Sequence, residues 1–161
     1  MLTVGTTAKV QPARHVSFMT HVVRLPDGTL TRDGQPLAEG AYCRSLLRTL
    51  DLFCPITGDR RPRVADLGCL EGGFALTFAQ AGYEVVGIEG RRSNIERCQF
   101  LASAFRLPQL SYTHEDVRNV AAYGRFDAIF CAGLLYHLDQ PVAFLRLLGS
   151  LTERLLMVQT H

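Results

Sequence analysis

The chain has 161 residues, of which 47% are hydrophobic and 20% are charged, and its formal net charge is +2. This length and composition predict one globular domain, large enough to bury roughly two-thirds of its unfolded surface. The small net charge argues against a protein that binds nucleic acid or an anionic membrane through a strong electrostatic field.

The cysteines argue against both a metal site and a disulfide framework. Their number is odd, and they are scattered with no C-x-x-C pair: Cys43, Cys54, Cys69, Cys98 and Cys131. The N-terminus shows no basic segment followed by an apolar run, so no signal peptide is expected. The longest nearly unbroken apolar run, residues 128–136, is about half the length of a membrane crossing. We therefore expect a cytoplasmic protein with no metal and no membrane association.

The first 36 residues are predicted to be an extension that precedes the main domain, residues 37–161. Residues 1–20 show no clear periodicity, and we expect them to be mobile or to lie across the domain. Residues 21–25 and 29–31 flank Pro26-Asp27-Gly28, a pattern typical of a small β-hairpin. This hairpin would either cap one end of a sheet or act as a lid over a ligand.

Residues 37–53 are predicted to form a helix with one buried stripe. Its apolar residues recur at intervals of three and four: Tyr42, Leu46, Leu47, Leu50 and Phe53. The loop after this helix contains the cluster Arg60, Arg61 and Arg63, and Arg91 with Arg92 forms a second basic cluster. These arginines are either solvated at strand ends or in contact with an acidic substrate.

The most informative stretch is a strand, a glycine loop and a helix in direct succession. Val64–Leu67 is typical of a short buried strand, Gly68 opens a tight turn, and Gly72-Gly73 leads into a helix that ends near Gly82. Such a turn directs backbone N–H groups and the positive end of the helix at one point. The motif therefore predicts a site for an anionic group such as a carboxylate or a phosphate.

A second strand, residues 84–88, is followed by Glu89, 21 positions after Gly68. This is close to the interval of roughly 20 residues at which a nucleoside-binding βαβ unit carries the acid that binds the ribose. Leu70 occupies the place of the middle glycine in a G-x-G-x-x-G fingerprint, where a side chain prevents close approach of a pyrophosphate. The pattern favours a nucleoside ligand and disfavours a dinucleotide.

Further along, residues 91–105 are predicted to form a helix and residues 110–113 a third strand, followed by Asp116 and Val117. Residues 126–138 are typical of a fourth, central strand that runs into an apolar turn containing His137. A helix is expected to begin near Pro141, with Asp139 as its N-cap. Residues 154–161 are predicted to form a fifth strand.

The order of these features resembles the class I S-adenosylmethionine-dependent methyltransferases, over roughly residues 63–161. The resemblance implies a Rossmann-like α/β fold with a mostly parallel, twisted sheet of about five core strands in the order 3-2-1-4-5 and helices on both faces. It also implies S-adenosylmethionine as the cofactor. In that family Glu89 would bind the ribose, while Asp116 would accept a hydrogen bond from the adenine amine and Val117 would donate its N–H to the ring. The implied cofactor-binding residues are Asp66, Gly68, Cys69, Leu70, Gly72, Gly73, Glu89, Gly90, Arg91, Asp116, Val117, Cys131 and Ala132.

His137 is the candidate catalytic residue. It stands after a central strand, where open α/β sheets place ligands, and it would act as a base for a hydroxyl or a protonated amine. A lone histidine in an apolar stretch is also compatible with a structural role.

Compared with the resembling fold, the chain would lack the last two strands. Leu155, Leu156, Met157 and Val158 are consecutive apolar residues, as expected of a strand covered on both faces. Left at the edge, this strand would be open to pairing. We therefore expect a longer protein, or a homo-oligomer formed through this strand.

The predicted function is methyl transfer to a small-molecule acceptor, with RNA or protein acceptors as further possibilities. Two alternatives stay open, namely a non-catalytic module that resembles a methyltransferase and a nicotinamide-dependent oxidoreductase.

Overall fold

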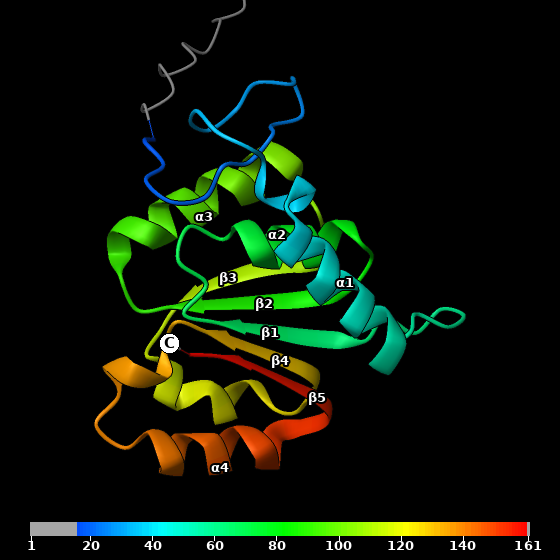
Figure 1. Ribbon diagram of the computed structural model, residues 1–161, viewed down its shortest axis with the longest axis vertical. Coiled ribbons are helices and arrows are strands. Elements are labelled where there is room, and N and C mark those ends of the chain that lie inside the picture. Colours follow the sequence, from blue (N-terminus) through cyan, green and yellow to red (C-terminus); the bar gives the residue numbers. More distant parts are fainter. Residues whose placement is uncertain (1–15, 161) are drawn as a thin grey trace, which may run out of the picture.

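The protein is built on a parallel β-sheet that helices cover on both faces (Figure 1). Its structure is a computed structural model that describes residues 16–160. Within this range the sheet has five strands in the order β3-β2-β1-β4-β5, and all neighbouring strands are parallel. The strands are β1 (Arg63–Leu67), β2 (Glu84–Glu89), β3 (Leu110–His114), β4 (Phe126–Ala132) and β5 (Thr152–Gln159). The predicted fold class and strand order are confirmed.

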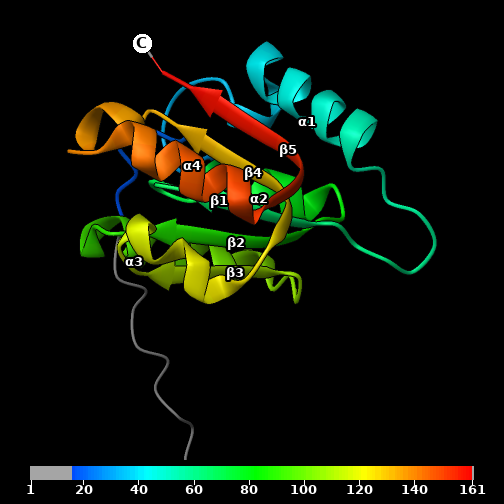
Figure 2. The same ribbon diagram turned by 90° about the horizontal axis from the view of Figure 1, so that it is seen from below.

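Three helices cover one face of the sheet, namely α1 (Ala41–Phe53), α2 (Gly73–Gln80) and α3 (Arg92–Phe105). The other face carries the 3-10 helix η2 (Val117–Tyr123) and α4 (Pro141–Leu151), which lies in front of the sheet in Figure 2. Residues 16–160 also contain two short 3-10 turns, η1 (Leu37–Glu39) and η3 (Leu135–His137).

The strands are apolar over most of their length because both faces of the sheet are buried. Along β4, Ala128 and Phe130 belong to the core beneath α1, α2 and α3, whereas Ile129 and Cys131 belong to the core beneath η2 and α4. Successive side chains of a strand point to opposite faces, so a strand in this position needs apolar residues at consecutive places.

The chain order creates a crevice between β1 and β4. From β1 the chain continues outward to β2 and β3, then returns to β4 on the other side of β1 and continues to β5. The connections after β1 and β4 therefore diverge at the carboxyl ends of two adjacent strands. In open α/β sheets this switch point is where ligands bind.

The predicted stripe of α1 is correct at its centre and wrong at its ends. Leu50 is buried together with Cys43, which the prediction omitted, while Tyr42 and Phe53 are 44% and 50% exposed. The buried face is centred on Cys43 and Leu50, and the two aromatic residues fall at its margins. Tyr42 instead donates its hydroxyl to Gln159 Oε1 at the end of β5, at 2.6 Å.

The predicted hairpin is smaller in the structure than in the prediction. Residues 21–31 form the expected turn, in which Asp27 Oδ1 accepts from the Thr29 N–H. One bridge pairs Arg24 with Leu30, and the Thr31 N–H donates to the Val23 carbonyl at 3.0 Å. The first arm also has partners outside the hairpin, because the Val22 carbonyl accepts from the Leu37 N–H and the His21 N–H donates to Glu71. The part of the N-terminal prediction that concerns residues 1–15 lies outside the described residues.

Two further details concern the C-terminal half. Helix α4 begins at Pro141 as predicted, but its N-cap is Gln140 and not Asp139. In β5, Met157 is buried while Val158 is 41% exposed, and the strand lies at one edge of the sheet within residues 16–160. Pairing of this edge with a second copy, and the domain boundary at residue 36, stay predictions.

Gly87 in β2 offers a test of the packing beneath the crevice. A Cβ at this position would lie 2.7 Å from Tyr112 Cδ1 and 3.0 Å from Cys69 Sγ. Gly87→Ala is therefore expected to lower the free energy of unfolding by about 1–3 kcal/mol, measured by urea denaturation. Gly149→Ala is the matched control, because a Cβ there meets nothing within 4 Å and alanine stabilises a helix by about 0.5–1 kcal/mol. Equal unfolding free energies for the two variants would contradict this packing.

Candidate functional site

The loop between β1 and α2 adopts left-handed backbone conformations at alternate residues. The φ angles are +67° at Gly68, +52° at Leu70 and +81° at Gly72. For leucine this conformation costs of order 1 kcal/mol or more, so the surroundings must hold it. Two hydrogen bonds hold the Leu70 backbone in this conformation. The Leu70 N–H donates to Glu89 Oε2 at 2.9 Å, and the Leu70 carbonyl accepts from Cys98 Sγ at 3.3 Å.

Contacts from distant segments hold the two glycines at the start of α2. The Tyr112 hydroxyl donates to the Gly72 carbonyl at 2.7 Å, and the Gly73 N–H donates to His21 Nδ1 at 3.0 Å. A Cβ at Gly72 would lie 2.7 Å from the Tyr112 hydroxyl oxygen, and a Cβ at Gly73 would lie 2.9 Å from His21 Nδ1. Glycine is needed at both positions because other side chains occupy the space.

Asp66 lies buried beneath this loop, near the end of β1. Its Oδ2 accepts from the Ala75 N–H in the first turn of α2 at 3.0 Å. Burial raises the pKa of Asp66 to about 7, despite the opposing effect of the Ala75 hydrogen bond, and the charge of Glu89 adds to the rise. Near neutral pH the carboxyl group is therefore poised between its protonated and ionised forms.

Glu89, the last residue of β2, is held in one orientation by two backbone donors. Its Oε2 accepts from the Leu70 N–H and its Oε1 accepts from the Arg91 N–H at 2.7 Å. The side chain is buried, yet Glu89 lines a cavity. Each carboxylate oxygen can accept a second hydrogen bond, so the group can still bind vicinal hydroxyls.

The cavity lies at the carboxyl ends of the first four strands and has a volume of about 660 Å³. This is within the usual size range of ligand pockets. The wall is built by the loops after β1, β2, β3 and β4, together with η3. Its lining residues are Gly68, Leu70, Glu89, Gly90, Arg91, His114, Glu115, Asp116, Val117, Ala132, Gly133, Leu134, Tyr136 and His137.

The structure brings most of the predicted site residues to this cavity. Nine of them line it: Gly68, Leu70, Glu89, Gly90, Arg91, Asp116, Val117, Ala132 and His137. The other five lie behind the wall, where they shape the loop and the ends of β1 and β4: Asp66, Cys69, Gly72, Gly73 and Cys131. Whether each contacts a cofactor stays a prediction.

Five further residues line the cavity. Gly133 and Leu134 follow Ala132 on the side expected to face the sulfonium and the acceptor, whereas His114, Glu115 and Tyr136 were not predicted. His114 and Glu115 directly precede Asp116, and Tyr136 directly precedes His137. Their positions next to predicted residues were therefore the available signal. His114 is fixed toward the cavity rim by a hydrogen bond between its Nε2 and the Gly90 carbonyl at 3.0 Å.

Asp116 has a structural partner in Arg118. Its Oδ1 accepts from the Arg118 N–H at 2.9 Å, which makes it the N-cap of η2, and both carboxylate oxygens bind the Arg118 guanidinium. The hydrogen bonds from Arg118 lower the pKa of Asp116 to about 2. Contact with adenine would need an oxygen lone pair that Arg118 leaves available.

His137 lies on η3, in the connection after β4. It is exposed, and its ring packs against that of Tyr136 with a centroid distance of 4.4 Å. The position gives the imidazole access to the cavity, as a base toward an acceptor requires.

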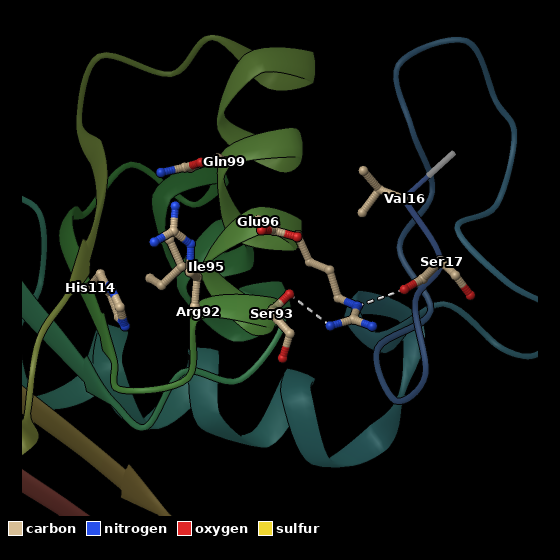
Figure 3. Close-up of a pocket in the computed structure, with 9 residues that line it drawn as sticks. Val16, Ser17, Arg92, Ser93, Ile95, Glu96, Gln99 and His114 are labelled. Atoms are coloured by element: carbon tan, nitrogen blue, oxygen red, sulfur yellow. Dashed lines mark hydrogen bonds between the residues drawn. The ribbon is translucent and has the colours of Figure 1, made fainter. Parts of the chain in front are cut away.

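The basic clusters are separated by the length of the sheet. Arg60 pairs with Asp127 at 2.8 Å and Arg63 with Glu84 at 3.2 Å, at the amino ends of the strands and away from the cavity. Arg91 lines the cavity, whereas Arg92 lines a neighbouring cavity of about 750 Å³ between residues 16–17 and α3 (Figure 3). Of these arginines, Arg91 is the one placed to meet a ligand of the crevice.

Two general observations concern the residues that the structure describes. They contain no cluster of three or more His, Cys, Asp or Glu side chains suited to a metal ion. None of the described helices combines the length and the apolar character that crossing a membrane requires.

Comparison with known proteins identifies the family. A model of the methyltransferase domain family matches residues 64–153, which is more than half of the chain. The chain belongs to the class I S-adenosylmethionine-dependent methyltransferases.

Three relatives illustrate the range of this family. The ubiquinone biosynthesis O-methyltransferase of Albidiferax ferrireducens is 29% identical over 109 residues, which cover 66% of this chain and 42% of that protein. The O-antigen chain terminator bifunctional methyltransferase/kinase WbdD of Escherichia coli is 27% identical over 157 residues. The matched region covers 86% of this chain and 22% of WbdD. The tRNA U34 carboxymethyltransferase of Trichodesmium erythraeum is 30% identical over 93 residues, which cover 56% of this chain and 28% of that protein. The chain thus spans less than half the length of each relative.

Among solved structures, the N-terminal domain of EvdMO1 is similar in both fold and sequence. Its structure in the presence of SAH (S-adenosylhomocysteine) and D-fucose has a TM-score of 0.65 and 30% identity, covering 81% of this chain and 55% of that one. The same domain with SAH bound has a TM-score of 0.60.

The raised pKa of Asp66 leads to a test by pH-dependent stability. In the folded protein the pKa of Asp66 is about 7, above its usual value of 3.8, so stability falls as the pH rises from about 4 to 7. Asp66→Asn removes the buried charge and keeps an acceptor for the Ala75 N–H. We expect the variant to be about 1–3 kcal/mol more stable than the wild type at pH 8 and nearly equal to it at pH 4, measured by urea denaturation. The exposed Asp33→Asn serves as the control and should follow the wild type at both pH values.

Proposed function

We propose that this chain transfers a methyl group from S-adenosylmethionine to a hydroxyl group of a small molecule. The observation that carries the proposal is the Glu89 carboxylate, which two backbone amides hold at the wall of a nucleoside-sized cavity. The bound SAH in the EvdMO1 domain supports the choice of cofactor.

The proposed roles of the cofactor-site residues are those that the family resemblance implies. Glu89 accepts hydrogen bonds from the ribose hydroxyls. Asp116 and the Val117 backbone, after β3, bind the adenine. Asp66 and the backbone of the loop from Gly68 to Gly73 hold the methionine part, directly or through water. No pyrophosphate site is needed, which fits the leucine at position 70.

The acceptor is placed beside the end of β4. Gly133, Leu134, Tyr136 and His137 form this side of the cavity. In the reaction an acceptor oxygen about 3 Å from the methyl carbon forms the new C–O bond, while the C–S bond breaks in line and S-adenosylhomocysteine leaves. His137 takes the proton of the hydroxyl group, and the remaining rate enhancement comes from holding the two reactants in line.

Several observations favour a hydroxyl of a small molecule over RNA. The net charge of +2 gives no basic stripe for a phosphate backbone. An O-methyltransferase and an O-antigen methyltransferase are among the relatives, and a similar domain was crystallised in the presence of D-fucose. A carbohydrate-like acceptor with free hydroxyls is therefore our first choice, and the tRNA-modifying relative makes RNA the second.

A two-stage experiment tests this function. Calorimetric titration with S-adenosylhomocysteine is compared with titration by NADH, and only the former is expected to bind. Methyl-labelled S-adenosylmethionine is then incubated with separate pools of small hydroxyl compounds, amines and RNA. Label in the hydroxyl pool supports the proposal, and binding without transfer to any pool would favour a non-catalytic module.

Glu89→Ala tests the ribose contact. The variant loses about two charge-assisted hydrogen bonds, each worth about 1.5–3 kcal/mol, so the affinity for S-adenosylhomocysteine should fall at least about tenfold. Glu84→Ala is the matched control, because Glu84 begins the same strand and is exposed at the other end of the sheet. Unchanged affinity in Glu89→Ala would remove Glu89 from the site.

His137→Gln tests the base. We expect kcat for a hydroxyl acceptor to fall by about 10²–10⁴-fold, since the glutamine cannot take the proton. The affinity for S-adenosylhomocysteine should stay within about twofold of the wild type, because His137 lies on the acceptor side. A recovery of the rate as the pH rises would indicate that hydroxide ion replaces the missing base, whereas an unchanged kcat at neutral pH would rule out this role.

A further inference from the structure

Glu71 is part of the cofactor loop but makes its contacts on the side away from the cavity. It lies between Leu70 and Gly72 and is 1% exposed. Its carboxylate accepts from three consecutive backbone N–H groups, those of Met19 at 2.6 Å, Thr20 at 2.9 Å and His21 at 2.7 Å. These donors belong to residues 16–23, which we term the N-terminal strap.

Arg97 of α3 joins the same cluster. Its Nε lies 3.2 Å from Glu71 Oε1. Nε also donates to the Ser17 carbonyl at 2.6 Å, and Nη1 donates to the Ser93 carbonyl at 2.7 Å, which are the two dashed lines in Figure 3. The loop, the strap and α3 therefore meet at one ion pair that is largely hidden from solvent.

A second contact joins the strap to the loop two residues further on. His21 Nδ1 accepts from the Gly73 N–H, and the ring packs edge-on against Phe74 with a centroid distance of 5.5 Å. Burial lowers the pKa of His21, although the charge of Glu71 acts in the opposite direction. The neutral form that can accept this hydrogen bond is thus favoured.

The strap is needed to satisfy the charge of Glu71. Burial opposes ionisation of this carboxyl group, but the three N–H donors and His21 outweigh it and lower the pKa of Glu71. A buried carboxylate without such donors is strongly unfavourable. Without the strap, Glu71 loses these three donors and, among the described residues, keeps only its ion pair with Arg97. This loss occurs one residue from the Leu70 N–H that orients Glu89.

We infer that Glu71 is a positioning residue that couples docking of the N-terminal strap to cofactor binding. It acts through Leu70 and Gly73 without contacting the cofactor. Because coupling is reciprocal, a bound cofactor stabilises the docked strap to the same degree as the docked strap improves cofactor binding. The inference rests on the proposed function, since it assumes that the cavity binds the adenosyl cofactor.

Hydrogen exchange on the full chain tests the coupling. In the wild type, S-adenosylhomocysteine should slow exchange of the amides of residues 19–21 about tenfold or more. Glu71→Gln replaces one acceptor oxygen with an NH2 donor. In this variant the amides of residues 19–21 should exchange faster without ligand, the ligand-induced slowing should be lost, and the affinity for S-adenosylhomocysteine should fall about tenfold. Glu96→Gln, an exposed residue of α3, is the matched control for the loss of charge.

A second pair of variants leaves the loop sequence unchanged. Thr20→Pro removes one donor to Glu71, whereas Thr20→Ala keeps the backbone N–H, and the Thr20 side chain is exposed. We expect weaker ligand binding in Thr20→Pro alone, with KM for S-adenosylmethionine raised more than kcat is lowered. If Glu71→Gln fails to fold, the comparison of Thr20→Pro with Thr20→Ala still tests the coupling between strap docking and cofactor binding.

The outcomes separate the two proposals. If the wild type does not bind S-adenosylhomocysteine, the proposed function is wrong and the coupling is wrong with it. If the wild type binds but Glu71→Gln and Thr20→Pro show wild-type affinity and wild-type slowing of exchange, the function stands and the coupling is overturned.

Discussion

The structure depends on carboxylates that are buried around one loop and satisfied by backbone N–H groups. Asp66 accepts from Ala75, Glu89 accepts from Leu70 and Arg91, and Glu71 accepts from Met19, Thr20 and His21. A buried carboxylate is tolerated only when such donors replace water. Each of these groups therefore constrains the backbone that satisfies it, and together they determine the path of the loop between β1 and α2.

The strand order of the sheet sets the position of this loop, and the loop carries backbone groups that shape the cofactor site. Because β1 and β4 are adjacent while their connections diverge, a crevice opens where the loop leaves the sheet. The acid at the end of β2 lies across the same edge, since parallel neighbours align their carboxyl ends. A site for a nucleoside is thus a consequence of strand order, and the acceptor side is built by the connection between β4 and α4.

Sequence reasoning worked best where a residue's role is local or set by the strand that carries it. Gly68 and Glu89 were predicted from spacing alone, and both line the cavity. It was incomplete where a segment has distant partners, and wrong where adjacent residues could each cap a helix. The first arm of the expected hairpin also bonds to Leu37 and Glu71, and the helix cap expected at Asp139 is at Gln140. His114 and Tyr136 were missed because no pattern distinguishes a lining residue from its neighbour.

The amino-acid sequence by itself determined the succession of strands and helices and the edge of the sheet at which the site lies, because periodicity and glycine placement act within short stretches. The resemblance to a known family implied the fold class and the strand order. Only the tertiary structure decided the partners of Glu71, His21 and Tyr112, which come from segments about 40 to 50 residues away. Such contacts depend on how α3, the strap and the sheet pack together, and no local pattern encodes that packing.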